Sequence, residues 1–336
     1  MRRLPVESVC DLFAGTTRVG QGLRETGLVV HSNDLATYSE VLGIAYIEAD
    51  QSLDRERIQG LIEHLSATKP VHGYFTETFC VQSRFFQPEN GMKVDAIRDE
   101  IDRLDVNRIE RGVLLTSLME AADRVDSTCG LQMAYIKKWA SRSFKPLELR
   151  MPAAVIGPAG AVTRVDANEL APKLTGDCTY IDPPYNQHSY FSNYHIWESL
   201  IRWDKPEHYG VACKRIDCKT TKSAYNRKRE AWDAFAGLIR DVATPWMVIS
   251  FSNEGYHDRD AIVQLLAESR YVRCIATDFK RYVGAQIGIH NLQGEKVGEV
   301  SHLRNKELLF LAGPDSAVLD SAVKDLEGAG EQLALV

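Results

Sequence analysis

Short apolar runs that end in acidic residues alternate with helical stretches at the start of the chain. Residues 6–13 predict a strand, residues 14–22 a tight glycine-containing turn, and the apolar face from Leu23 onward a helix. Residues 28–34 form a second short apolar run that closes on Asp34. A strand, loop, helix, strand and acidic residue in that order within about 35 residues predict an α/β unit of the nucleotide-binding kind.

Two longer stretches have the spacing of helices. Residues 38–65 are predicted to be helical, and residues 94–125 place apolar side chains at helical intervals. The second stretch lies within residues 76–150, which interrupt the alternation of strands and helices. We therefore predict a mainly helical insertion at 76–150 in an α/β domain formed by residues 1–75 and 151–336.

Strand patterns return after this insertion. Apolar runs predict further strands at 161–166, 178–182 and 246–251. The last two runs, 271–276 and 307–311, predict an antiparallel hairpin at one edge. The predicted fold class is α/β, with a mostly parallel twisted sheet, an antiparallel edge hairpin and a mainly helical insertion.

Composition limits the classes of function. The 336 residues carry 40 Lys and Arg against 46 Asp and Glu, a net charge of −6, which argues against binding nucleic acid by bulk charge. The sequence has no run of 18 apolar residues and no signal-peptide pattern, so we expect a cytoplasmic protein that does not insert in a membrane. The seven cysteines are scattered without a Cys-x-x-Cys pair, which predicts a reducing compartment and no metal site.

The charge is unevenly distributed. Residues 205–230 hold eight basic and three acidic residues, a net charge of +5, which leaves −11 for the rest of the chain. A solvated loop is one interpretation. The other is a segment that contacts the phosphate backbone of a nucleic acid through Lys214, Lys219, Lys222, Arg227 and Lys228. Within the same segment, Tyr225, Asn226 and Arg227 are residue types suited to reading bases.

The most informative motif is Asp182-Pro183-Pro184-Tyr185, at the end of the strand predicted at 178–182. The prolines stiffen the loop and cannot donate hydrogen bonds to a sheet. The Asp182 carboxylate and the Pro183 carbonyl could accept both hydrogens of an exocyclic amine, and Tyr185 could stack on the ring that bears it. A turn without function is the alternative, but this tetrad should occur by chance in only about one chain per thousand of this size.

With this loop the chain resembles S-adenosylmethionine-dependent amino methyltransferases, and among them the DNA adenine-N6 methyltransferases. Residues 182–185 match their catalytic loop, and Phe13-Ala14-Gly15 match their first cofactor motif. Residues 281–288 and 300–307 are similar to C-terminal stretches of one subgroup. The resemblance covers most of residues 8–312.

The resemblance implies a Rossmann-like methyltransferase that uses S-adenosyl-L-methionine on an adenine flipped out of double-stranded DNA. It assigns catalysis to Asp182, Pro183 and Tyr185. It assigns cofactor binding to Asp11, Phe13, Ala14, Gly15, Asp34 and Asp166. Asp34 is placed to hold ribose hydroxyls and Asp166 to accept from the adenine amine, although Asp is also a common helix cap.

Two departures from the family pattern stand in the first loop. Thr17 occupies a position where many relatives carry a second glycine, and no cofactor motif precedes the first strand. Other nucleotide sites fit less well, because Gly15, Gly20 and Gly22 do not give Gly-x-Gly-x-x-Gly and Gln21 replaces the phosphate-binding lysine of a P-loop.

Several alternatives stay open. The chain lacks the Pro-Cys pair of cytosine-5 chemistry. A ribosomal RNA base-amine methyltransferase and a catalytically inactive methyltransferase-like DNA-binding module remain as rivals. Target recognition belongs either to residues 76–150, with Arg84, Gln87, Asn90 and Lys93 as candidates, or to residues 205–230. A cognate restriction endonuclease is a candidate partner, and the oligomeric state is unknown.

Overall fold

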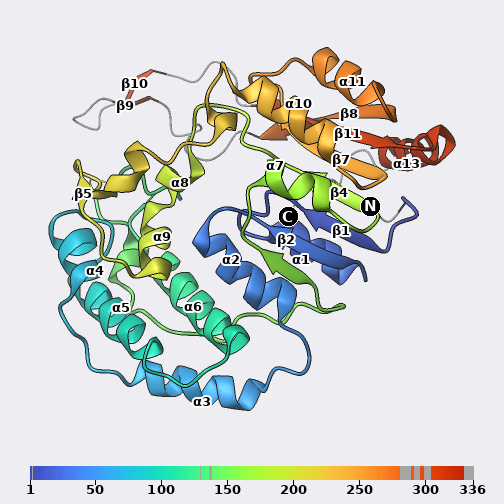
Figure 1. Ribbon diagram of the computed structural model, residues 1–336. Helices are drawn as coiled ribbons and strands as arrows, with labels where there is room; N and C mark the ends of the chain where they lie inside the picture. The colour runs from blue at the N-terminus through green and yellow to red at the C-terminus, as the bar shows by residue number, and fades with distance from the viewer. Residues whose placement is uncertain are drawn as a thin grey trace.

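The computed structural model describes residues 1, 3–128, 130–135, 138–280, 289–290, 296–298 and 304–328 (Figure 1). The family-like stretch at 281–288 and residues 300–303 of the second stretch lie outside the described residues. Two short ladders accompany the main sheet: β5 (His208–Tyr209) with β6 (Lys214–Arg215), and β9 (Ile289–His290) with β10 (Lys296–Gly298).

A seven-stranded sheet forms the core of the α/β part, in the order β3-β2-β1-β4-β7-β11-β8. The first five strands are parallel to one another, and β11 is antiparallel to both β7 and β8. Their bounds are β1 (Ser8–Asp11), β2 (Val29–Asn33), β3 (Ala161–Thr163), β4 (Cys178–Ile181), β7 (Trp246–Ser252), β8 (Tyr271–Lys280) and β11 (Arg304–Gly313). The predicted fold class is confirmed, including the antiparallel pair at one edge.

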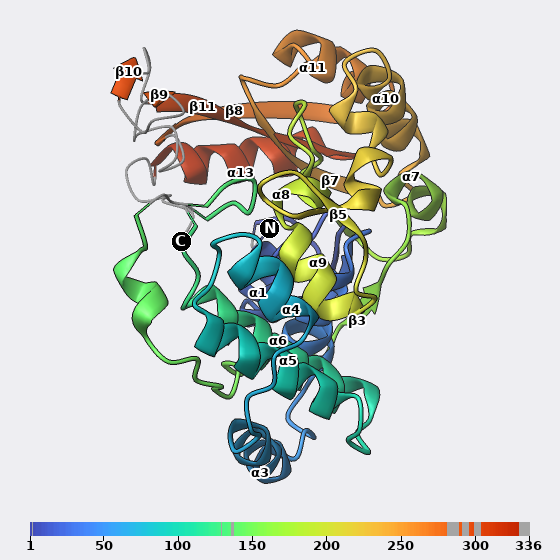
Figure 2. The ribbon, with the colours of Figure 1, turned by 90° about the vertical axis from the view of Figure 1, so that its left-hand side faces the viewer.

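Helices cover both faces of this sheet, so its central strands are apolar on both sides. Every residue of β7 is buried; Met247 and Phe251 face the core beneath α10 and α11, whereas Trp246 and Val248 face the core beneath α13. Figure 2 shows α10 and α11 on one side of β8 and β11, with α13 on the other. The helices of this part are α1 (Arg18–Glu25), α2 (Thr37–Gly43), α7 (Ala167–Leu170), α10 (Ala231–Asp241), α11 (Arg259–Ala267) and α13 (Ser316–Gly328).

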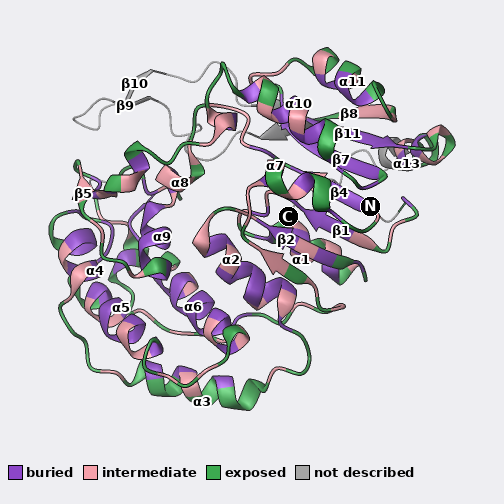
Figure 3. Cartoon of the chain, in the orientation of Figure 1, coloured by how far each residue is buried: buried purple, intermediate pink, exposed green. Residues whose placement is uncertain are grey.

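A second group of helices packs around its own apolar core, seen at the lower left of Figure 1 and as buried inner faces in Figure 3. This core includes Phe75, Phe79, Leu114, Leu118 and Leu200. The helices are α3 (Arg55–Ser66), α4 (Tyr74–Thr76), α5 (Pro88–Ile101), α6 (Arg108–Asp123), α8 (Tyr190–Asn193) and α9 (His195–Arg202). Short π or 3-10 turns are η1 (Ile44–Glu48), η2 (Glu77–Val81), η3 (Ser141–Phe144), η4 (Ala171–Lys173), η5 (Ile216–Lys219) and η6 (Ala224–Asn226).

Both stretches predicted as helical are divided. Residues 38–65 form the end of α2, η1 and α3, because Asp54 caps α3 by accepting the Arg57 amide at 2.9 Å. Residues 94–125 form α5 and α6, because Asn107 and Glu110 make a capping box at the start of α6. The apolar spacing is correct on both sides of each break. Capping side chains, rather than the apolar pattern, decide where a helix starts.

Candidate active site

The two predicted motifs meet at one edge of the sheet. β1 and β4 are neighbours, and the chain continues from β1 toward β2 on one side and from β4 toward β7 on the other. This reversal of strand order is a topological switch point, where ligands bind beyond the carboxyl ends of strands in open α/β sheets. The loop after Asp11 and the loop that begins at Asp182 both leave their strands at this edge.

Asp11 is a buried carboxylate without a hydrogen-bond partner. Its side chain is 1% exposed, and neither oxygen accepts a hydrogen bond from the described residues. Burial raises the pKa of Asp11 to about 7, and the negative charges of Asp182 and Asp34 raise it further. The nearby Gly20 amide lowers this pKa slightly, although it forms no hydrogen bond with the carboxylate. A ligand with a cationic or N–H group would satisfy this carboxylate.

The glycine loop stands open beside it. Gly15 has φ +51, and an added Cβ would meet no atom within 4 Å. The Gly15 amide donates to Asp34 Oδ2, and the Ala36 amide donates to Asp34 Oδ1, both at 2.9 Å. The Ala14 amide donates to the Asn33 carbonyl at 2.9 Å. The end of β2 therefore holds the loop, and Asp34 is part of that support; burial raises its pKa.

Thr17 keeps the conformation that glycine would favour. It lies in the left-handed region at φ 61 and ψ 11, as the N-cap of α1, and its side chain is fully buried. Its hydroxyl donates to the Thr16 carbonyl at 2.7 Å and accepts from Gln21 Nε2 at 3.0 Å. Thr17 therefore adopts a backbone conformation that glycine would also adopt, at a conformational cost of about 1–2 kcal/mol.

Phe13 and Asp166 lie on two sides of Tyr225. The Phe13 ring meets the Tyr225 ring edge-on, with centroids 5.4 Å apart. The Tyr225 hydroxyl donates to Asn168 Oδ1 at 2.7 Å, and Asp166 Oδ1 accepts the Asn168 amide at 2.9 Å as the cap of α7. Asp166 thus has the capping role considered as its alternative, while Tyr225, only 5% exposed, supports the loop from within.

The catalytic loop begins directly after β4. Asp182 reaches solvent. The protein around it nevertheless displaces water from the carboxylate and raises its pKa to about 7, and the negative charge of Glu307 raises this pKa further. Pro183 is buried. The Tyr185 ring packs on Phe251 with centroids 5.8 Å apart, and its carbonyl accepts the Tyr256 amide at 2.9 Å.

Asn226 fixes the continuation of this loop. Its side-chain nitrogen donates to the Asn186 carbonyl at 2.8 Å and to the His188 carbonyl at 3.1 Å. Residues Tyr225 and Asn226, which the sequence presented as types suited to reading bases, are instead occupied in supporting the site. Their separation of 40 residues from the catalytic loop hides this role in the sequence.

Two further residues, Glu307 and Tyr190, lie near Asp182. Glu307 lies on β11, opposite Ser252, and Ser250 Oγ donates to Glu307 Oε1 at 3.2 Å. Tyr190 is 50% exposed and stacks on Tyr194, with centroids 6.3 Å apart and planes 18° from parallel. The stretch that contains Glu307 was recognised as family-like, but the position of β11 beside β7 is a long-range property of the sheet.

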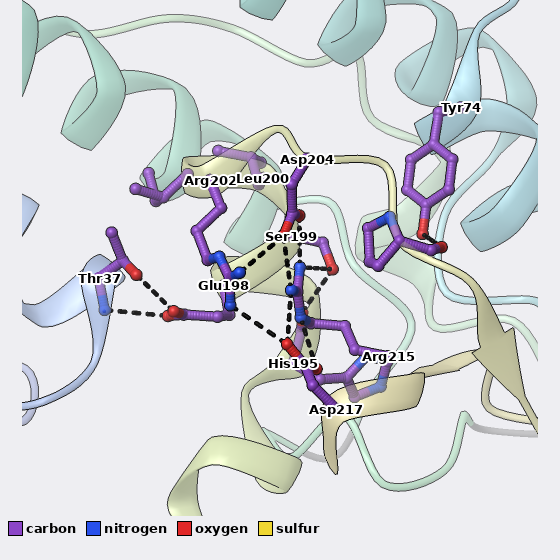
Figure 4. Close-up of polar contacts among 12 residues, drawn as sticks. Thr37, Tyr74, His195, Glu198, Ser199, Leu200, Arg202, Asp204, Arg215 and Asp217 are labelled. Atoms are coloured by element: carbon purple, nitrogen blue, oxygen red, sulfur yellow. Dashed lines mark hydrogen bonds and ion pairs between the residues drawn. The ribbon is translucent and has the colours of Figure 1, made fainter. Parts of the chain in front are cut away.

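The basic segment 205–230 contains cations of different kinds. Arg215 is 1% exposed and binds both oxygens of Asp204 at 2.7 and 2.8 Å, and it also binds Asp217 (Figure 4). Arg227 pairs with Glu230 at 2.8 Å. Of the five predicted DNA contacts, Lys214 is half-buried. Lys219 Nζ lies 4.5 Å from the Tyr209 ring centroid. The other three, Lys222, Arg227 and Lys228, are exposed.

Helix α9 links this segment to the sheet. Ser199 Oγ lies 3.4 Å from Arg215 Nη1, and Glu198, only 3% exposed, accepts the Thr37 amide at 3.0 Å and the Thr37 hydroxyl. Figure 4 shows Glu198 pointing to Thr37 while Arg215 lies between Asp204 and Asp217. Thr37 begins α2, three residues after Asp34.

Candidates in the helical insertion are used inside it. Asn90 is buried and donates to the Lys145 carbonyl at 2.9 Å, and Lys93 Nζ donates to the Ser66 and Thr68 carbonyls near the end of α3. Arg84 lies 4.8 Å from the Trp139 ring centroid. These contacts place Asn90, Lys93 and Arg84 in the internal packing of the helical part. None of the described helices is both long and apolar enough to span a membrane.

Comparisons with known proteins agree with one another. The sequence model of the D12 class N6 adenine-specific DNA methyltransferases matches residues 2–257. The type II methyltransferase M.NlaIII of Neisseria lactamica is 30% identical over 306 residues, 88% of this chain and 90% of that protein. The type II methyltransferase M.FokI of Planomicrobium okeanokoites is 32% identical over 279 residues, 76% of this chain and 42% of that protein.

A further curated relative is the modification methylase LlaI of Lactococcus lactis subsp. lactis, 28% identical over 319 residues. That similarity covers 88% of this chain and 50% of the relative. This chain therefore spans half or less of the length of M.FokI and LlaI, but nine-tenths of M.NlaIII.

Proposed function

This chain belongs to the D12 class N6 adenine-specific DNA methyltransferases, and we propose that it methylates an adenine flipped out of double-stranded DNA with S-adenosyl-L-methionine as methyl donor. One juxtaposition carries the proposal. The Asp182–Tyr185 loop leaves β4 beside the unpartnered carboxylate of Asp11 at the switch point of the sheet. Neither a ribosomal RNA substrate nor an inactive module is supported by the family match.

The residues at the end of β1 fit the methyl donor. S-adenosylmethionine, when bound, supplies a methyl group on a cationic sulfur and carries an ammonium group. The buried oxygens of Asp11 would hold that ammonium, and the open space over Gly15 would admit the methionine end. Asp34 would hold the ribose hydroxyls, with Phe13 and Asp166 near the adenine. Ala14 would line the same loop.

The catalytic loop is suited to hold the target amine. The Asp182 carboxylate and the Pro183 carbonyl would accept the two N6 hydrogens, which favours a more tetrahedral nitrogen and directs its lone pair toward the methyl group. Tyr185 would stack on the adenine ring. Base flipping costs a few kcal/mol, and stacking of about 1–3 kcal/mol would offset much of it.

Segment 205–230 would bind the duplex. Its exposed cations lie on the same stretch of chain as Asn226, which holds the catalytic loop, so phosphate contacts there would present DNA to Asp182. The segment would act through Lys214, Lys219, Lys222, Arg227 and Lys228. Since the relatives are named type II methyltransferases and modification methylases, we also propose a cognate restriction endonuclease as functional partner.

The test is transfer of a tritiated methyl group to unmethylated plasmid DNA. We expect label in N6-methyladenine with the unaltered protein, and a loss of about 10³-fold or more with Asp182→Asn, because the amide cannot replace the charge that faces the developing cation. Calorimetry should give S-adenosylmethionine binding within about threefold of the unaltered protein, since Asp182 contacts the target and not the donor.

Asp241→Asn, an exposed carboxylate at the end of α10, serves as the control and should retain full activity. Label in ribosomal RNA but not in DNA would support the rival substrate. No binding of S-adenosylmethionine, even with DNA present, would support an inactive module. Transfer that survives Asp182→Asn would show that the catalytic assignment is wrong.

A further inference from the structure

Polar side chains form a row across four neighbouring strands at the edge that carries the catalytic loop. Asp11 of β1 pairs in register with Tyr180 of β4, and parallel partners share a face. Asp182 follows Tyr180 by two residues and so continues on that face. Tyr180 in turn pairs with Val248 of β7, and this ladder ends with Ile181 opposite Ile249, so Asp182 and Ser250 are the next residues along the two chains.

Glu307 of β11 completes this row. β11 runs antiparallel to β7 and brings Glu307 directly opposite Ser252, so the two side chains share a face with Ser250. The hydrogen bond from Ser250 Oγ to Glu307 Oε1, at 3.2 Å, fixes the carboxylate toward this face. The antiparallel strand β11 therefore places a second carboxylate at the edge of the sheet where Asp182 lies.

The titratable groups that interact with this pair in the described part of the chain include acidic and phenolic side chains. Glu307 interacts with Asp182 and with the hydroxyls of Tyr180, Tyr185 and Tyr190, and Asp11 interacts with Asp182 from the other side. Burial raises the pKa of Glu307. Neither Asp182 nor Glu307 forms an ion pair among the residues described, so the charge of Glu307 acts on Asp182 without neutralisation.

We propose that Glu307 is a positioning residue for methyl transfer, which acts through Asp182 on the proton that the target amine must lose. The proposal rests on the proposed function. The N6 lone pair forms a bond to the methyl carbon, the carbon–sulfur bond breaks with its electron pair on sulfur, and one N6 proton passes to the Asp182 carboxylate. The negative charge of Glu307 makes Asp182 a better acceptor for that proton, which later leaves to water.

The test is the pH dependence of single-turnover methyl transfer by the full chain, with unmethylated plasmid DNA and saturating S-adenosylmethionine. Glu307→Gln keeps an oxygen for Ser250 but removes the charge. Asp182 then ionises at lower pH and accepts a proton less well, so the acid limb should move down by about half a pH unit or more while the plateau falls about tenfold. Glu307→Asp retains the charge at a greater distance, and its acid limb should lie between the two.

Glu268→Gln is the control, because Glu268 is exposed at the end of α11 and pairs with Arg240 at 2.9 Å. Its profile should coincide with that of the unaltered protein. Thermal unfolding of each variant reports folding, and Glu307→Asp carries the comparison if Glu307→Gln does not fold. An acid limb and a plateau unchanged in both Glu307 variants would overturn the proposal while leaving Asp182 dependence intact. Absence of transfer by the unaltered protein would instead overturn the proposed function.

Discussion

Three aspartates at the ends of strands differ in how the fold satisfies them. Asp34 accepts two backbone amides, Asp182 faces solvent beside Glu307, and Asp11 is buried with no partner among the described residues. A buried polar group without a partner costs free energy. Its retention in an otherwise packed core therefore points to a ligand, and Asp11 is the residue whose charge the methyl donor would satisfy.

Replacement of Asp11 should separate stability from binding. Its pKa is about 7 in the folded protein against an ordinary value of 3.8, so the stability gained on protonation is present below about pH 4 and lost as pH rises through 7. At pH 8 the charged form is penalised, and Asp11→Asn should increase the free energy of unfolding by up to about 4 kcal/mol. The gain should vanish near pH 4, and calorimetry should show weakened S-adenosylmethionine binding.

Asp177→Asn provides a control of opposite sign. The Glu7 amide and the Ser8 hydroxyl and amide lower the pKa of Asp177. The ionised Asp177 carboxylate stabilises the folded protein at neutral pH, and this stabilisation is lost as pH falls. Asp177→Asn should therefore be less stable than the unaltered protein at pH 8. Urea unfolding at pH 8 and at pH 4 or below measures both differences. Destabilisation by Asp11→Asn at pH 8 would contradict the assignment of a buried, unsatisfied charge.

At the scale of elements, the basic segment combines anchoring residues with exposed cations. Arg215 and Asn226 hold the segment to α9 and to the catalytic loop, whereas Lys222 and Lys228 are exposed and make no ion pair within the described residues. A net charge counted along the sequence treats these residues alike. Only the exposed group is available to phosphates.

Neutralising Lys222 and Lys228 together should weaken DNA binding and its salt dependence. Each phosphate contact contributes about 0.9 to the slope of log affinity against log salt, so the slope should fall by about 2 in the double alanine variant. Fluorescence anisotropy with labelled duplex over a salt series measures it. The double variant of Lys69 and Lys173, exposed lysines elsewhere, should leave the slope unchanged. An unchanged slope for both pairs would exclude the segment from the DNA interface.

For the whole molecule, α9 is the link between the helical core and the active edge. Its apolar residues Ile196 and Leu200 pack in the helical core. Its polar residues bind Thr37 at the start of α2 on one side and Arg215 on the other. The helix follows α8, which comes after the Asp182–Tyr185 loop, so α9 connects the start of α2 with the basic segment.

Arg215→Ala should therefore reduce stability despite the position of Arg215 in a segment rich in surface cations. Removing a buried guanidinium leaves Asp204 and Asp217 without their principal partner, and we expect a loss of about 3 kcal/mol in the free energy of unfolding. Lys214→Ala, one residue earlier, should lower DNA affinity with little loss of stability. Denaturant unfolding and anisotropy on both variants make the comparison, and equal stability of the two would refute the anchoring role.

Much of the fold follows from local patterns. The sequence predicts the two strands that lead to Asp11 and Asp182, and it predicts the antiparallel pair at the edge. These predictions are possible because strand and turn signals extend over only a few residues. The breaks at Asp54 and Asn107 were missed because single capping side chains interrupt a continuous apolar pattern. The catalytic and DNA-binding roles remain predictions, tested by the experiments above.

The sequence by itself determined the α/β class and the order of the two motifs, and it predicts the role of Asp182, since each depends on residues adjacent in the chain. Tertiary structure alone decided that Thr17 adopts the glycine-like conformation, that Arg215 and Asn226 anchor the basic segment, and that Glu307 lies on β11 close enough for its charge to act on Asp182. The physical reason is distance along the chain. Glu307 and Asp182 are brought together by strand pairing across β7, and pairing between strands so far apart depends on the packing of the whole sheet rather than on any short segment.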